Sequence, residues 1–180
     1  MRRPLGTRIR SSPSRQTGWQ VGPTITPHRQ REYCSRVPIE IKLLRAEDAH
    51  LLEHVGADVF DHPIDPEAAR AFLADPCLHL AVAVDDGVVV GMASAVHYHH
   101  PDKPVPELWI DEVGVASTHQ GRGLGKALLA AMFDHGRQLG CGEAWVVTER
   151  TNEAAMRLYA AAGGVEASEP TVMLSFALAD

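Results

Sequence analysis

Apolar and polar residues alternate in several short stretches of the chain, and this period of two is typical of β-strands. The first such stretch covers residues 39–43. Residues 79–84 and 88–96 are apolar runs separated by Asp85-Asp86-Gly87, a sequence that favours a hairpin turn. The same pattern predicts further strands at residues 107–115, 143–148 and 172–178.

A helical period of apolar residues appears between these strands. Residues 48–60 form an amphipathic stretch. Asp65, followed by a proline, is the expected N-cap of a helix that ends at Ala74. A long helix is predicted over residues 120–139 and a short one over residues 152–162. Because strands and helices are interleaved, the fold class is predicted to be mixed α/β.

The first 37 residues differ from the rest of the chain in composition. They hold eight Arg and one Glu, which gives a net charge of +7, and they are rich in Ser, Pro, Thr and Gly. Such a segment cannot bury enough apolar surface to become ordered, so residues 1–37 are expected to be a disordered extension. Residues 38–180 are expected to form one domain.

Charge and apolar content exclude some classes of protein. Residues 38–180 hold nine basic and 22 acidic residues, a net charge of −13. This charge repels nucleic acid and attracts polycationic small molecules. No run of eighteen apolar residues is present, so we expect no membrane span.

The cysteine and histidine patterns do not predict a metal centre. Cys34, Cys77 and Cys141 are scattered without C-x-x-C spacing, which argues against a zinc knuckle or a disulfide framework and favours a reducing cytoplasm. His97 and His99 would share a face of a strand, but the loop after them is rich in proline and has no cysteine. We therefore expect no metal and consider residues 97–100 a stretch that contacts the substrate.

A glycine-rich turn follows the strand at residues 107–115 and opens the long helix, with the sequence Gln120-Gly121-Arg122-Gly123-Leu124-Gly125-Lys126. The N–H groups at a helix start lack intrahelical partners, and the helix dipole adds partial positive charge. Glycines let a phosphate approach the backbone closely, so the turn predicts a pyrophosphate site. Its spacing fits neither a Walker A loop nor a dinucleotide fingerprint.

The spacing Gln120-x-x-Gly123-x-Gly125 resembles the Q/R-x-x-G-x-G/A signature of GNAT acetyltransferases, which bind acetyl-CoA with it. Residues 152–163, NEAAMRLYAAAG, are similar to a second motif of that family, N-x-x-A-x-x-L-Y-x-x-x-G-F, with Gly164 in place of the Phe. The similarity covers residues 39–178. It implies a mostly antiparallel sheet of six to seven strands with splayed central strands, flanked by about four helices. It also implies acetyl transfer from acetyl-CoA to an amine, and dimers are common in the family.

The resemblance assigns roles to individual residues. Main-chain groups of the strand before the glycine turn would pair with pantetheine, and the turn would bind the pyrophosphate. Tyr159 would be the general acid that protonates the coenzyme A thiolate. The implied cofactor site comprises Val113, Gly114, Val115, Gln120, Gly121, Arg122, Gly123, Leu124, Gly125, Lys126, Asn152 and Tyr159.

The acceptor amine must lose a proton before it attacks, so a carboxylate is expected beside the thioester. Glu112 is the first candidate for this general base, Asp111 the second and Glu107 the third. Strict strand alternation places Glu112 on the same face as Ile110 and Gly114, and Asp111 on the other face. A carboxylate near the end of a central strand is costly unless it is paired or functional.

The substrate class follows from a narrower resemblance. Residues 85–91 and 107–115 look like the aminoglycoside 3-N-acetyltransferases of the GNAT fold, which show a run E-I-Y-I-Y-D-L-A-V and acetylate the 3-amino group of deoxystreptamine. This chain has Glu112 where those enzymes have Asp, and Gly114 where they have Ala. The charge of −13 suits such polycationic acceptors. Four acidic residues could bind further ammonium groups or could be ordinary surface residues: Asp58, Asp61, Asp65 and Glu67.

Other functions stay open at this stage. A GNAT enzyme with this sequence could instead acetylate a polyamine, another small amine or a protein N-terminus. A non-catalytic sensor of acyl-CoA is the alternative of another class. Nucleic-acid binding by the basic extension is disfavoured by the acidic domain.

Overall fold

The computed structural model describes residues 38–168 and 171–178. The predicted disordered extension of residues 1–37 lies outside this range. By its internal contacts, the chain from Arg36 to Asp180 forms one unit.

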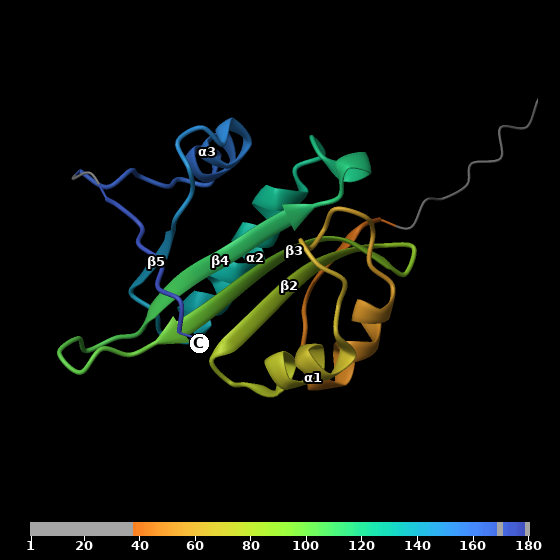
Figure 1. Cartoon of the computed structure of the whole chain (residues 1–180), viewed down its shortest axis with the longest axis horizontal. Coiled ribbons are helices and arrows are strands. Elements are labelled where there is room, and N and C mark those ends of the chain that lie inside the picture. The colour runs from red at the N-terminus through yellow and green to blue at the C-terminus, as the bar shows by residue number, and fades with distance from the viewer. Residues whose placement is uncertain (1–37, 169–170, 179–180) are drawn as a thin grey trace, which may run out of the picture. The chain divides into compact units, whose positions relative to one another are not determined.

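The described residues form a five-stranded sheet in the order β1-β2-β3-β4-β5 (Figure 1). Three neighbouring pairs are antiparallel, and β4 and β5 are parallel. The mixed α/β class and the mostly antiparallel sheet are therefore confirmed, with five strands in place of the expected six to seven. The strands are β1 (Glu40–Leu43), β2 (Leu78–Asp85), β3 (Val88–Tyr98), β4 (Glu107–Val115) and β5 (Glu143–Val146).

In the part of the chain that the structure describes, three α-helices and two 3-10 helices accompany the sheet. Residues Ala46–Glu53 form the 3-10 helix η1, and Ser117–His119 form η2. The α-helices are α1 (Pro66–Ala74), α2 (Leu124–Gln138) and α3 (Glu153–Ala161).

The boundaries of α1 and α2 have identifiable causes. The Asp65 side chain accepts hydrogen bonds of 2.8 Å from two N–H groups of the first turn of α1, so this helix begins where the sequence predicts. Helix α2 begins at Leu124 and not at Gln120, because Gly121 and Gly123 have positive φ angles of 73° and 80°. A left-handed backbone cannot continue an α-helix, so these residues form the turn that precedes it.

Helix α2 packs on one face of the sheet, while η1 and α1 lie over β2 and β3 on the other (Figure 1). On α2, Leu128, Leu129 and Met132 are fully buried. They meet a sheet face to which β4 contributes Leu108 and Ile110, both also buried. Strand β4 is thus fixed from one side by the apolar core.

The strand predicted at residues 172–178 is not formed. Residues 171–178 have no regular structure, and their large apolar side chains are 72–98% exposed. Alternation specifies which side chains would share a face, but it does not supply the sheet edge with which a strand must pair. The prediction of this last strand was therefore wrong.

Candidate active site

Strands β4 and β5 pair only over part of β4. Their parallel register begins at Glu107 and ends where Ile110 meets Val146, and the two strands separate beyond this point (Figure 1). The N–H group of Ala116 donates to Val90 of β3 over 3.0 Å. Because main-chain groups of alternate residues point to opposite sides of a strand, those of Val113 and Val115 turn away from β3. They face the gap between β4 and β5.

A β-bulge interrupts β4 at Asp111. Ile110 lies opposite Ala95 of β3, and Glu112 lies opposite Ser94, so Asp111 is one extra residue in the ladder. Directly opposed residues share a face, and neighbours on β3 lie on opposite faces. Glu112 therefore lies on the face opposite to Ile110, and the strict alternation predicted from sequence was wrong for this pair.

Glu112 is half-buried on the sheet face opposite to α2. Burial raises the pKa of its carboxyl group, and the negative charges of Asp61 and Asp111 raise it further. The two carboxylates that sequence ranked first and second as general base are thus electrostatic neighbours. Asp61, which sequence named only as a possible ammonium ligand, joins them from a loop about fifty residues away in the chain.

Residues 54–63 form a segment that we name the crossing loop, because it runs over the end of β4. The Gly56 N–H donates to the Val89 carbonyl over 2.8 Å, which anchors the start of the loop to β3. The buried Val59 places its carbonyl oxygen over the α-carbon of Gly114. A β-carbon at Gly114 would lie 2.2 Å from this oxygen. The crossing loop, which carries Asp61, is therefore fixed on β3 and β4.

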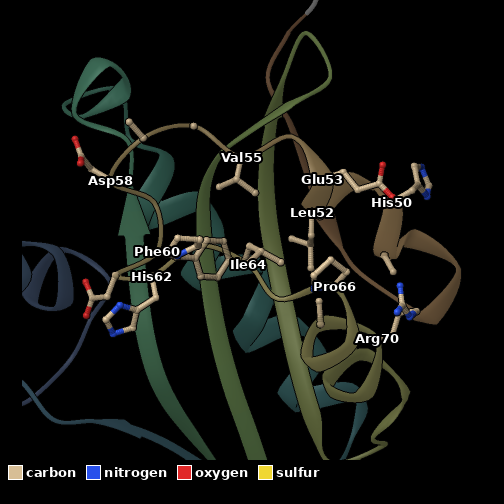
Figure 2. Close-up of a pocket in the computed structure, with 16 residues that line it drawn as sticks. His50, Leu52, Glu53, Val55, Asp58, Phe60, His62, Ile64, Pro66 and Arg70 are labelled. Carbon is tan, nitrogen blue, oxygen red and sulfur yellow. The ribbon is translucent and has the colours of Figure 1, made fainter.

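A pocket of about 780 Å³ lies between the crossing loop, η1 and α1 (Figure 2). Its apolar wall includes Val55, Phe60 and Ile64, and Asp58 and Asp61 supply acidic groups. All of its lining residues lie between positions 49 and 70, so the predicted cofactor and catalytic residues do not line it. Asp61 links the two regions, since it lines the pocket and acts on the pKa of Glu112.

At the glycine-rich turn, no side chain among the described residues caps the start of α2. Gly123 is the N-cap residue, in the left-handed conformation, and makes no side-chain cap. The first hydrogen bond of the helix runs from Ala127 N–H to the Gly123 carbonyl, so the N–H groups before it have no intrahelical acceptor. The Gln120 side chain donates to the Val115 carbonyl over 3.1 Å and joins the turn to β4. Arg122 folds back onto the Thr118 carbonyl at 3.0 Å.

Helix α3 packs against the start of α2. A β-carbon at Gly125 would lie 3.1 Å from the Leu158 side chain, so the third glycine of the turn serves helix packing. Asn152 caps α3 by accepting a hydrogen bond from Ala155 N–H at 3.1 Å. Next to Leu158, Tyr159 is half-buried, and this burial raises the pKa of its phenol.

Helix α3 ends in a Schellman motif. Gly163 has a φ of 92°, and the Gly164 N–H donates to the Tyr159 carbonyl over 2.8 Å. A β-carbon at Gly164 would lie 2.9 Å from that carbonyl oxygen. This contact accounts for glycine where the second sequence motif has Phe.

Three histidines form a chain between the sheet and α2, which sequence analysis did not predict. His79 hydrogen-bonds His97 over 2.8 Å and His135 over 3.1 Å. Burial lowers the pKa of His79 to about 4, and the neighbouring His135 and His97 lower it as well. The three rings are thus linked by hydrogen bonds in the order His97, His79, His135. Among the described residues, no group of three or more His, Cys, Asp or Glu is arranged to hold a metal ion.

The separation of β4 and β5, the uncapped glycine turn and the two sequence motifs agree with a match to the Acetyltransferase (GNAT) family, whose model covers residues 44–163. The chain belongs to the GNAT acetyltransferase family. It is also 31% identical, over 128 residues, to the N-alpha-acetyltransferase RimI of Mycobacterium tuberculosis. This similarity covers 70% of the chain and 78% of the relative.

Solved GNAT structures share the fold at lower identity. An aminoglycoside acetyltransferase from an uncultured soil metagenomic sample, solved in complex with sisomicin, has a TM-score of 0.65 and 20% identity, over 78% of this chain and 96% of that one. The aminoglycoside N-acetyltransferase AAC(6')-Iy in complex with CoA has a TM-score of 0.60 and 23% identity, over 77% and 98%. Within the described part of this GNAT domain, no helix is long and apolar enough to cross a membrane.

Proposed function

We propose that this GNAT domain transfers the acetyl group of acetyl-CoA to a primary amine of a small polycationic acceptor, the 3-amino group of an aminoglycoside. The observation that carries the acceptor class is a group of three carboxylates, in which the charges of Asp61 and Asp111 act on Glu112 just beyond the last pairing of β4 with β5. A substrate with several ammonium groups complements such a site.

The residues around the gap fit acetyl-CoA. Val113 and Val115 have main-chain groups turned toward the gap, and a pantetheine arm can pair with such groups as a strand would. The uncapped N–H groups at the start of α2 suit the pyrophosphate. Gly114, which pairs with Met92 of β3, has a different role in this proposal. Because it has no side chain, it leaves room for the crossing loop to pack on β4.

Acetyl-CoA supplies an acetyl group activated as a thioester. Glu112 takes a proton from the acceptor ammonium, and the raised pKa of its carboxyl makes it a stronger base than an ordinary glutamate. The Val113 N–H faces the negative charge that develops on the carbonyl oxygen, a contribution of about 3 kcal/mol in comparable sites. Tyr159, whose pKa is raised by burial, keeps its proton at neutral pH and gives it to the departing sulfur.

Release of free thiol from acetyl-CoA tests this function, with purified protein and a panel of gentamicin, spermidine and short peptides as acceptors. We expect release with gentamicin and a loss of about a hundredfold or more in kcat for Glu112→Gln. Release with spermidine alone would move the acceptor class to linear polyamines. Coenzyme A binding without turnover of any amine would make the protein a sensor.

A second candidate function is favoured by one specific observation, the 31% identity to RimI over 70% of the chain. In that case the acceptor is the α-amino group of a protein. The peptide arm of the same assay tests it, because turnover of peptides with no turnover of gentamicin would select this candidate.

A further inference from the structure

Two tryptophans lie side by side on the face of the sheet that carries Glu112. Trp109 of β4 is the register partner of Trp145 of β5. Their ring centroids are 5.0 Å apart and their planes differ by 10°, which is a stacked arrangement. The pair spans the last part of the sheet in which β4 and β5 are still joined.

Polar contacts hold the stacked pair in one orientation. The Trp145 indole N–H donates to the Tyr98 hydroxyl over 2.8 Å, and this hydroxyl donates to the Glu107 carboxylate over 3.0 Å. Lys103 also binds Glu107. A side chain that is already fixed by packing and hydrogen bonds loses little conformational entropy when a ligand binds to it.

The position of the pair relative to Glu112 follows from the β3 register. Trp109 lies opposite Val96, and Glu112 lies opposite Ser94, two residues away on the same face. Two residues along a strand span about 7 Å, which is the width of one sugar or cyclitol ring. Trp109 remains 37% exposed although it is one of the largest apolar side chains of the sheet. An exposed indole thus lies one ring width from the proposed base.

We propose that the Trp109–Trp145 pair is a platform against which the ring of the acceptor packs. This contact determines the specificity of the site for cyclic polyamines. The apolar C–H groups of an aminocyclitol or amino sugar contact the exposed part of the Trp109 indole. An amino group on that ring then reaches Glu112, while further ammonium groups lie near Asp111 and Asp61. Cations are also attracted to indole rings, so the ammonium groups favour this orientation. The platform rests on the proposed function of Glu112 as the base.

The test is direct binding, which does not require turnover. Gentamicin, spermidine and coenzyme A are titrated by calorimetry into the full chain, its Trp109→Ala and Trp109→Phe variants, and the control Val105→Ala. Val105 is 44% exposed, lies in the loop before β4 and is not part of the stacked pair, so its variant removes exposed apolar surface without changing either indole. We expect Trp109→Ala to raise the Kd for gentamicin about tenfold, from the indole area that it removes.

Several controls distinguish the loss of the platform contact from a general loss of structure. Trp109→Phe is expected to recover part of the gentamicin affinity. The Kd of coenzyme A is expected to stay within about twofold in all variants, and Val105→Ala to match wild type. Tyr98→Phe removes the hydroxyl that holds Trp145. This variant is expected to raise the Kd for gentamicin about fivefold, which corresponds to the loss of one hydrogen bond.

The outcomes distinguish this proposal from the proposed function. If wild type acetylates gentamicin and Trp109→Ala binds it as tightly as wild type, the platform is overturned and the aminoglycoside function stands. If wild type binds no gentamicin and acetylates peptides, both the platform and the aminoglycoside assignment are overturned. If the affinity for spermidine falls as much as that for gentamicin, the specificity for rings is overturned.

Discussion

The main-chain carbonyl oxygen of Val59 occupies the space that a side chain at position 114 would need, 2.2 Å from the expected β-carbon of Gly114. The crossing loop therefore reaches β4 only because residue 114 is glycine. Gly114→Ala is expected to displace this loop and to lower the free energy of unfolding by about 2 kcal/mol. Urea unfolding followed by circular dichroism measures this change.

Gly142→Ala is the matched control for that prediction. A β-carbon there meets only the Val105 side chain, at 2.8 Å, and this exposed side chain can rotate away. We expect a change in unfolding free energy of less than about 1 kcal/mol. Equal losses in the two variants would show that the Val59 contact is not the cause.

Asp61→Asn is expected to change the pH profile of acetyl transfer. The negative charge of Asp61 raises the pKa of Glu112, so its removal lowers that pKa. The acid limb of kcat/KM should then move to lower pH, because Glu112 stays ionised to a lower pH. Asp134→Asn, which removes the same charge from an exposed site on α2, should leave the limb in place. If the acid limb does not move in Asp61→Asn, the charge of Asp61 does not act on the catalytic base.

Stability is expected to fall in mild acid because of His79. Its folded pKa of about 4 lies below the ordinary value of 6.5, so the unfolded chain binds the proton more tightly. This stabilisation is fully present above pH 6.5 and is lost as the pH falls toward 4. The total is roughly 3 kcal/mol for a shift of this size.

Melting temperatures measured between pH 7 and pH 4.5 check this prediction. His79→Leu should flatten the dependence on pH, because the group that takes up the proton is gone. His62→Leu, a change at an exposed histidine, should keep the wild-type slope. A steep slope that persists in His79→Leu would assign the acid sensitivity to other groups.

Tyr159→Phe is expected to lower kcat about a hundredfold, since a positioned general acid contributes at least this much. Helix α3 should remain folded, because its Asn152 cap and its contact with Gly125 through Leu158 are unaffected. Pre-steady-state release of thiol, with the melting temperature as a control, measures the effect. A kcat close to wild type would exclude Tyr159 as the proton donor.

Local sequence signals predicted local structure well. Asp65 with the proline after it predicted where α1 begins, and Ala74 is where the helix ends. The Asp86-Gly87 turn joins β2 and β3 with both residues at positive φ, as hairpin turns of this kind require. The Asn152 cap and the left-handed Gly163 bound α3. Each signal works because cap and turn chemistry depend only on residues within a few positions.

Features that depend on distant partners were not predictable in this way. The bulge at Asp111 exists only relative to β3, so the face of Glu112 was assigned wrongly from β4 alone. The stacking of Trp109 on Trp145 requires the parallel register of strands 36 positions apart. Residues 171–178, which have no regular secondary structure, show the same limitation, since a strand pattern does not identify the strand with which it would pair.

In a gene, the bulge of β4 corresponds to a single additional codon. Without Asp111, Ile110 and Glu112 would still lie opposite Ala95 and Ser94, so the ladder would be continuous and Glu112 would keep its face. The bend that a bulge imposes would be lost, and it coincides with the point where β4 parts from β5. A single residue inserted between Ile110 and Glu112 therefore bends β4 at the point where its pairing with β5 ends, without replacing any residue of the core.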